Sequence, residues 1–213
     1  MHRRFVAELC QRHAGEDIWV IGSASSMDFV APEFFANKCV IGVNDVFRKY
    51  PCTYLVRKEN TGAADALASG IPLICSEYDC GNRTASRNSV EGTVWYFDHV
   101  HNDCVEMDLS VVGTNRIVVS HSTITSAIHI AADMGAANIM ICGHDGGMFE
   151  GRMTYRGYYG DDPAYQQWYR DWVRKIMQQS RILRDRLKEV YGCQIHSLNP
   201  FIGFDLEGRR FET

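Results

Sequence analysis

The sequence predicts a single Rossmann-like α/β domain, with a mostly parallel sheet and helices on both faces. Three observations support this fold class. Apolar runs of strand length recur along the chain and alternate with helical patterns. Two of these runs, at residues 18–21 and Cys39–Val43, end in small or polar residues, as strands do when their carboxyl ends face a ligand. Near residue 126 a helical pattern leads into a strand and a polar loop, which completes a βαβ pattern.

Length and composition favour one soluble domain over residues 1–213. Apolar residues make up 46% of the chain, enough for a sizeable core. The net charge of −4, without a basic block, argues against a dedicated nucleic-acid surface. No apolar run reaches the roughly 20 residues that cross a bilayer, and Met1 leads into no secretory signal, so we expect a cytoplasmic protein. The eight cysteines form no C-x-x-C pair and are expected as free thiols. Self-association stays open.

In the first half of the chain, strands alternate with short helices. We expect strands at 18–21, Cys39–Val43, 53–56 and 71–75. Short helices are expected at 5–12, at 32–37, where Pro32 suits a first turn, and at Ala63–Ala68. Residues 76–115 are polar and turn-rich around one apolar segment at 94–97, so we expect loops around a strand there, near the ligand site.

The second half begins with a helix at 126–134, which residues 122–125 can cap and Gly135 can end. A strand follows at 139–142. Residues 148–162 are rich in Gly and Tyr, which predicts a lid over the site, with a plain surface loop as the alternative. A long helix, Pro163–Tyr191, has an apolar stripe in which we assign Trp168 and Trp172 to the core. The strand Gln194–Ser197 follows this helix.

Small and hydroxylic residues follow the first strand. Their hydroxyls and backbone N–H groups can bind phosphate, although a tight turn at the strand exit is the alternative; they are Gly22, Ser23, Ser25 and Ser26. The turn is not G-x-G-x-x-G, and the chain has no G-x-x-x-x-G-K-[ST], which argues against a Rossmann dehydrogenase and a P-loop kinase. Asn44 ends the second strand and can contact a base or ribose, or form an Asx turn.

His144 and Asp145 directly follow the strand at 139–142. Either can act as a general base or hold a metal, and a carboxylate beside an imidazole raises the pKa of that imidazole. The alternative is an aspartate that caps the next loop. In the predicted lid, Arg152 and Arg156 lie near Tyr155, Tyr158 and Tyr159, a combination suited to contacting a phosphate.

Together these motifs resemble the nucleotide-binding half of bacterial sialyltransferases of the Campylobacter type (glycosyltransferase family 42). Gly22-Ser23-Ala24-Ser25-Ser26, followed by Val43-Asn44-Asp45, resembles the family's G-N-G-P-S turn and the Asn that contacts its cytidine nucleotide. The segments from Thr123 to Asp145 and from Leu187 to Pro200 resemble later parts of those enzymes. Gly143-His144-Asp145 and the lid also resemble the "domain of unknown function 115" group, which includes flagellin-modifying factors and the archaeal hydroxymethylpterin diphosphokinase.

The resemblance implies roles for individual residues. Gly22, Ser23 and Ser26 would line the phosphate and ribose, Asn44 would contact the nucleotide, Thr125 and Ser126 would lie near the base or sugar, and Asp145 would lie at the edge of the site. The chain departs from the family at Ala24, Ser25, Thr123 and Gly147. It also has no histidine between Phe149 and Tyr191, where the family has a catalytic one. Contact with the leaving phosphate would then come from Tyr155, Tyr158 or Tyr159.

We therefore expect an enzyme that transfers a sugar from a nucleotide-activated donor to an acceptor hydroxyl and requires no cofactor. His144 or Asp145 would be the base, and Arg152, Arg156 and a lid tyrosine would contact the departing phosphate. One alternative is diphosphate transfer from ATP to a hydroxymethyl group, with Mg²⁺ held by Asp145. Another is a non-catalytic nucleotide-binding module.

Overall fold

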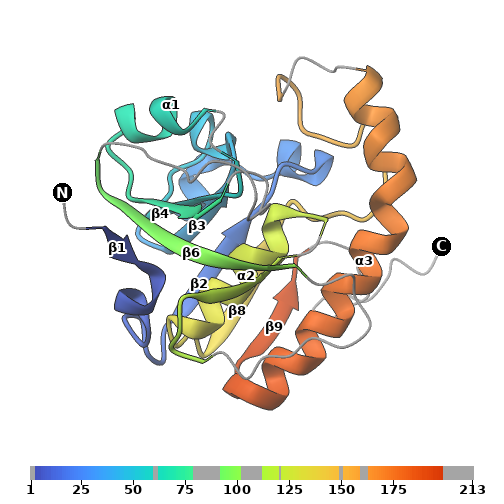
Figure 1. Ribbon diagram of the computed structural model, residues 1–213. Helices are drawn as coiled ribbons and strands as arrows, with labels where there is room; N and C mark the ends of the chain where they lie inside the picture. The colour runs from blue at the N-terminus through green and yellow to red at the C-terminus, as the bar shows by residue number, and fades with distance from the viewer. Residues whose placement is uncertain are drawn as a thin grey trace.

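The structure is a computed structural model, and it describes residues 3–59, 62–78, 92–101, 112–119, 121–148, 151–158 and 163–198. Within these residues the chain forms one nine-stranded sheet in which the paired strands run parallel (Figure 1). Helices cover this sheet, which confirms the predicted α/β fold class. None of the helices in the described ranges is long and apolar enough to span a membrane.

The strands follow one another across the sheet in the order β1-β6-β5-β4-β3-β2-β8-β9, and β7 pairs with the carboxyl half of β6. Their bounds are β1 Arg4–Phe5, β2 Asp17–Ile21, β3 Cys39–Val43, β4 Tyr54–Arg57, β5 Leu73–Ser76, β6 Val94–His101, β7 Arg116–Val119, β8 Asn138–Cys142 and β9 Gln194–Ser197. From β2 the chain builds outward through β3 to β6, and later it adds β8 and β9 on the other side of β2. The boundary between β2 and β8 is therefore the switch point of the sheet, where open α/β sheets bind ligands.

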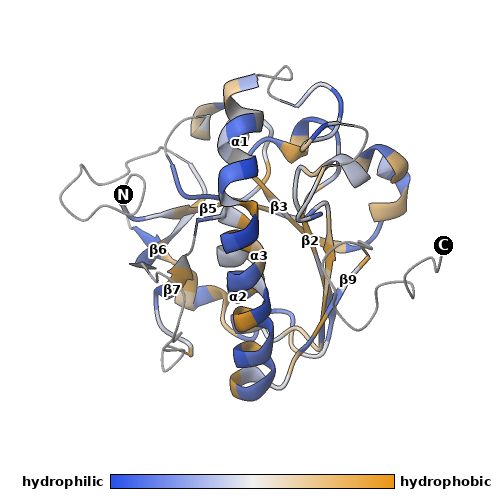
Figure 2. Ribbon diagram, turned by 90° about the vertical axis from the view of Figure 1, so that its right-hand side faces the viewer, coloured by the Kyte–Doolittle hydropathy of each residue, from blue (hydrophilic) through white to orange (hydrophobic). Residues whose placement is uncertain are grey.

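Three α-helices and four short 3₁₀ helices connect the described strands. The α-helices are α1 Ala63–Ala68, α2 Thr123–Asp133 and α3 Pro163–Tyr191, and the 3₁₀ helices are η1 Val6–Leu9, η2 Ser25–Phe29, η3 Pro32–Phe35 and η4 Val46–Arg48. In Figure 2, α3 crosses the view in front of α2 and is mostly hydrophilic on the side that faces the viewer. Such a polar outer side is typical of a helix that covers a core.

The two faces of the sheet bury different sets of side chains because neighbouring residues of a strand point to opposite faces. Val20 packs in the cluster that contains α2 and α3, whereas Ile21 packs with Met27 and Phe35 of η2 and η3. Further along the sheet, Leu55 and its neighbours on that second face pack against α1. Helical layers thus cover both faces and leave the carboxyl ends of the central strands open between them.

Several predicted elements have the observed bounds, notably Cys39–Val43, Ala63–Ala68, Pro163–Tyr191 and Gln194–Ser197. The predicted helix at 5–12 is wrong, since Arg4–Phe5 pairs with β6 and only one 3₁₀ turn follows. Strand β7 was not predicted, although its partner β6 begins with the apolar segment at 94–97 where a strand was expected. Much of that stretch, at 79–91 and 102–111, lies outside the described residues. The six cysteines in the described ranges are free, as expected.

The assignment of Trp168 to the core is also wrong. Trp168 is 45% exposed and Trp172 is only half-buried, whereas Ile176 and Leu183 further along α3 are buried. Figure 1 shows the reason, because the N-terminal end of α3 extends beyond the carboxyl ends of β2 and β9. The apolar side of this N-terminal part of α3 therefore has no strand to pack against.

Candidate active site

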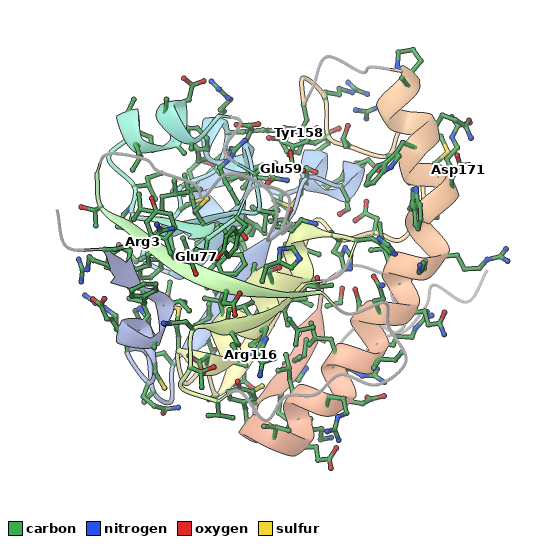
Figure 3. All side chains as sticks on the ribbon, viewed as in Figure 1. Arg3, Glu59, Glu77, Arg116, Tyr158 and Asp171 are labelled. Carbon is green, nitrogen blue, oxygen red and sulfur yellow. The ribbon has the colours of Figure 1, made fainter. Side chains whose placement is uncertain are left out.

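Three adjoining hollows lie at the carboxyl ends of β2, β3, β4 and β8. The central hollow has a volume of about 50 Å³ and is lined by Gly22, Ser23, Ala24, Val43, Asn44, Ser122, Thr123, Ile124, Gly143, His144, Met153 and Thr154. The side hollow has a volume of about 170 Å³ and is lined by Asn44, Asp45, Arg48, Arg57, Lys58, Glu59, Gly62 and Thr123. The outer hollow has a volume of about 420 Å³ and is lined by Asp45, Arg48, Lys49, Tyr155, Arg156, Gly157 and Tyr158. Figure 3 shows Glu59 and Tyr158 at this edge of the sheet.

Two glycines let the ends of β2 and β8 meet at the central hollow. The Gly22 N–H donates to the Cys142 carbonyl at 2.8 Å, and the Ala24 N–H donates to the Gly143 carbonyl at 3.0 Å. A Cβ at Gly22 would overlap the Gly143 carbonyl oxygen, and Gly143 itself has a φ of +66°. Only glycine combines this conformation with such close backbone approach. Where β2 and β8 meet, Gly22 and Gly143 therefore expose backbone atoms, rather than side chains, to the central hollow.

Asn44 lies where the central and side hollows meet. It follows β3 with a φ of 52°, a left-handed conformation that asparagine tolerates better than most residues. Its N–H donates to the Val56 carbonyl at 3.0 Å, which holds the backbone in place. The half-buried carboxamide has no hydrogen-bond partner among the described residues, so its donor and acceptor are both open to a ligand.

The N-terminus of α2 forms another wall of the central hollow. Ser122 caps the helix by accepting the Ile124 N–H at 3.4 Å, and Thr123 begins it. A helix N-terminus carries partial positive charge and favours an anion such as phosphate. Thr125 and Ser126, which the sequence had placed near the ligand, are fully buried and do not line the hollow. The Thr125 hydroxyl donates instead to the Ser122 carbonyl at 2.7 Å.

Asp145, which follows β8, binds the turn after β2 through hydrogen bonds. Its carboxylate accepts the Ser26 N–H at 2.7 Å, the Ser26 hydroxyl at 2.5 Å and the Ser25 hydroxyl at 3.3 Å. Burial raises the pKa of Asp145, although these hydrogen bonds act in the opposite direction. The two serines and Asp145 therefore hold one another beside the central hollow. Over the described ranges, no group of three or more His, Cys, Asp or Glu side chains could hold a metal ion.

His144 is buried but borders the central hollow. Its Nε2 lies 2.7 Å from the Ser180 hydroxyl oxygen, and that hydroxyl donates to the Ile176 carbonyl at 3.0 Å. Nε2 must then carry the ring proton, which leaves a lone pair on Nδ1. Burial lowers the pKa of His144 to about 4, so the ring is neutral near pH 7. The prediction that a neighbouring carboxylate raises the pKa of His144 is wrong. The Asp145 carboxylate bonds to Ser25 and Ser26 rather than to the imidazole.

The described part of the predicted lid, residues 151–158, is packed onto η2. Thr154 forms an antiparallel bridge with Ala24, and the Tyr155 N–H donates to the Ser23 carbonyl at 3.0 Å. Tyr155 and Tyr158 are buried in the core cluster of η2 and η3, and both also line the outer hollow. The segment therefore forms the wall between the central and outer hollows. Tyr159 lies outside the described residues, as do 149–150 and 160–162.

Asp28 of η2 connects this segment to the cations around it. Its carboxylate accepts the Arg156 N–H at 3.1 Å and 3.2 Å, pairs with Arg152 at 2.9 Å and pairs with Lys49 at 3.3 Å. Burial acts to raise the pKa of Asp28, but the hydrogen bonds from Arg152, the Arg156 backbone N–H and Lys49 outweigh it and lower the pKa. Arg152, predicted to contact a phosphate, pairs with Asp28, whereas Arg156 lines the outer hollow.

The structure thus brings Gly22, Ser23, Asn44 and His144 to one hollow, with the bonded Ser26 and Asp145 beside it. Sequence reasoning missed the lining residues Ser122 and Thr123 of the central hollow, and Arg48 and Lys49 of the outer hollow. Arg48 and Lys49 follow Asn44 within five positions, which is a usable signal. No sequence pattern indicated the role of Asp28, because its partners Arg152 and Arg156 lie more than 120 residues away along the chain.

No family model matches the chain, and neither the curated proteins nor the solved structures compared with it produced a match. The resemblance to sialyltransferases of the Campylobacter type therefore stays a prediction, and the proposal below depends on the geometry of the site.

Proposed function

We propose that the chain binds a nucleotide-activated sugar at the carboxyl edge of its sheet and transfers the sugar to an acceptor hydroxyl. One observation carries the proposal. The side chains of Ser23, Asn44 and Thr123 come from three different elements to the central hollow, and none has a hydrogen-bond partner in the described part of the chain. Polar side chains that are half-buried and unpaired around one hollow are suited to pairing with a ligand.

The chemistry of these groups suits a nucleotide. The Ser23 and Thr123 hydroxyls, with the N-terminus of α2, can hold a phosphate. Asn44 can both donate to and accept from a base or ribose. The central hollow is too narrow for a whole nucleotide, so the ligand extends into the side hollow, which Asn44 and Thr123 also line. There Arg48, which pairs with Asp65 at 2.5 Å, and Arg57, which pairs with Asp45 at 3.1 Å, lie beside the departing phosphate and can help to neutralise it.

His144 is the base in this proposal. Its Nδ1 lone pair can accept the proton of an acceptor hydroxyl, since Nε2 bonds to Ser180. A pKa of about 4 makes the free imidazole a weak base. A phosphate in the central hollow raises this pKa by its negative charge, so the base becomes stronger when the donor is bound. Asp145 does not need to accept the proton, because its role is to hold the turn after β2.

Thermal-shift and calorimetric titrations with CMP, UDP, GDP and ATP, with and without Mg²⁺, test the proposal. We expect stabilisation by CMP that does not depend on the metal. Asn44→Ala should weaken binding about tenfold, the value of one good hydrogen-bonding group. Asn37→Ala is the matched control, because Asn37 also has a left-handed φ, 62°, but is exposed and outside the three hollows. Both substitutions introduce the same backbone strain, and only Asn44→Ala should affect CMP.

Other outcomes select other functions. Stabilisation by ATP only with Mg²⁺ would favour diphosphate transfer. Tight nucleotide binding without turnover of any donor, unchanged by His144→Ala, would favour a non-catalytic module. If no nucleotide stabilised the protein, the proposal would be overturned.

A further inference from the structure

The outer hollow is lined by more cationic than anionic side chains. Three cationic side chains, Arg48, Lys49 and Arg156, and one carboxylate, Asp45, line it. Behind this lining, Arg48 also pairs with Asp65 at 2.5 Å and Lys49 pairs with Asp28 at 3.3 Å. The chain as a whole has a net charge of −4. A concave surface lined mainly by cationic groups attracts anionic ligands.

The outer hollow is also the right size and in the right place for a second substrate. Its volume of about 420 Å³ exceeds that of the other two hollows and falls within the ~300–1,000 Å³ range of small-molecule sites. It shares Asp45 and Arg48 with the side hollow. Residues 153–155 lie between it and the central hollow, because Met153 and Thr154 line the central hollow and Tyr155 lines the outer one.

The lining is held in position before any ligand binds. Lys49 pairs with Asp28 at 3.3 Å and lies 4.8 Å from the ring centroid of Tyr155. The backbone of Arg156 is held by the same carboxylate. The Tyr155 hydroxyl has no hydrogen-bond partner among the described residues, and burial raises the pKa of Tyr155, so it keeps its proton as a donor. Cations, an aromatic ring and a free hydroxyl are the groups that bind a charged sugar.

We infer that the outer hollow binds the acceptor substrate of the proposed transfer and that this acceptor is an acidic sugar, one bearing a carboxylate or phosphate group. The inference rests on the proposed function for the role of acceptor. The binding itself rests only on the outer hollow. The acid group pairs with Lys49 and Arg156, and the sugar ring packs beside Tyr155, so that a hydroxyl of the sugar can reach past the wall toward the donor.

Calorimetric titration of the whole chain with D-glucuronate, D-glucose 6-phosphate and D-glucose tests this inference. We expect at least one of the two acids to bind about tenfold or more tightly than glucose, as charge-assisted hydrogen bonds do, and its binding to weaken as salt is added. The acid that binds more tightly identifies carboxylate or phosphate as the preferred group. Arg156→Gln should weaken binding of that acid about tenfold. Arg174→Gln, at an exposed position of α3 outside the hollows, should leave it unchanged.

Tyr155→Phe is a second, milder variant, because it removes only a hydroxyl that has no hydrogen-bond partner in the described ranges. It should weaken acid binding by a few fold while the fold stays intact. Acids that bind no tighter than glucose, or an equal loss in Arg156→Gln and Arg174→Gln, would overturn the inference. CMP binding without acid binding overturns this inference alone and leaves the proposed function standing. Acid binding that depends on Arg156, without binding of any nucleotide, overturns the proposed function and supports the acidic-sugar site.

Discussion

His129 and His144 are both buried, and burial lowers the pKa of each to about 4. They differ in their surroundings. His129, on α2, accepts the Val118 N–H at Nδ1 at 3.0 Å, and its Nε2 lies 2.9 Å from the Tyr191 hydroxyl. His144 has Ser180 as its partner in the described part of the chain and borders the central hollow. Burial and a lowered pKa therefore do not by themselves identify a functional histidine. Both ring nitrogens of His129 have partners, whereas His144 borders a hollow and keeps Nδ1 available.

The hydrogen bonds of the His129 ring connect elements of the fold. Because Nδ1 accepts a backbone N–H, Nε2 must carry the proton and donate it to Tyr191. Asp133, whose carboxylate interacts electrostatically with Tyr191, accepts the Gly113 N–H at 2.8 Å. This network joins β7, α2 and the end of α3, and each hydrogen-bonding position of the His129 ring is used.

The largest expected difference between the two histidines is in the free energy of unfolding of their alanine variants. His129→Ala leaves a closed cavity and an unpaired Val118 N–H, so we expect the free energy of unfolding to fall by about 4 kcal/mol. His144→Ala opens onto the central hollow, where water can replace the ring, and should lose only about 1 kcal/mol. Urea unfolding measures both. Equal losses would mean that the two sites do not differ as described.

The pH dependence of stability is a smaller effect that both histidines share. Each has a pKa of about 4 in the folded state, below the ordinary value of 6.5, so the fold holds the neutral ring. Their contribution is complete above pH 6.5 and is lost as the pH falls toward 4, by up to about 3 kcal/mol for each ring. Urea midpoints between pH 7 and 5 should therefore fall. His129→Ala should show a shallower slope than the unmodified chain, and an unchanged slope would contradict the assignment.

The smallest effect concerns the response to ligand. CMP should raise the pKa of His144 by about one unit, worth about 1.4 kcal/mol, because its phosphate brings negative charge to the central hollow. The pKa of His129 should stay unchanged. Titration of the ring ¹⁵N resonances by NMR, with and without CMP, measures both in one sample. A shift at both rings, or at His129 alone, would show that the phosphate does not lie beside His144.

Much of the fold could be predicted because it depends on local patterns. The apolar runs and Pro163 were sufficient to predict β3, α1, α3 and β9. Strand β1 could not be predicted, because two residues become a strand only when β6 lies beside them. The exposure of Trp168 could not be predicted either, since the apolar stripe of α3 is longer than the sheet beneath it. Local spacing does not say where a partner element ends.

The amino-acid sequence by itself determined the α/β class and the small, polar residues that follow β2, β3 and β8, such as Ser23, Asn44 and His144. Only the tertiary structure decided which of these groups remain available to a ligand. Asp145 is taken up by Ser25 and Ser26, Arg152 by Asp28, and Thr125 by Ser122, whereas Asn44 has no hydrogen-bond partner among the described residues. The physical reason is that a polar group entering the interior must find a hydrogen-bond partner, and in a parallel sheet that partner can come from a distant part of the sequence.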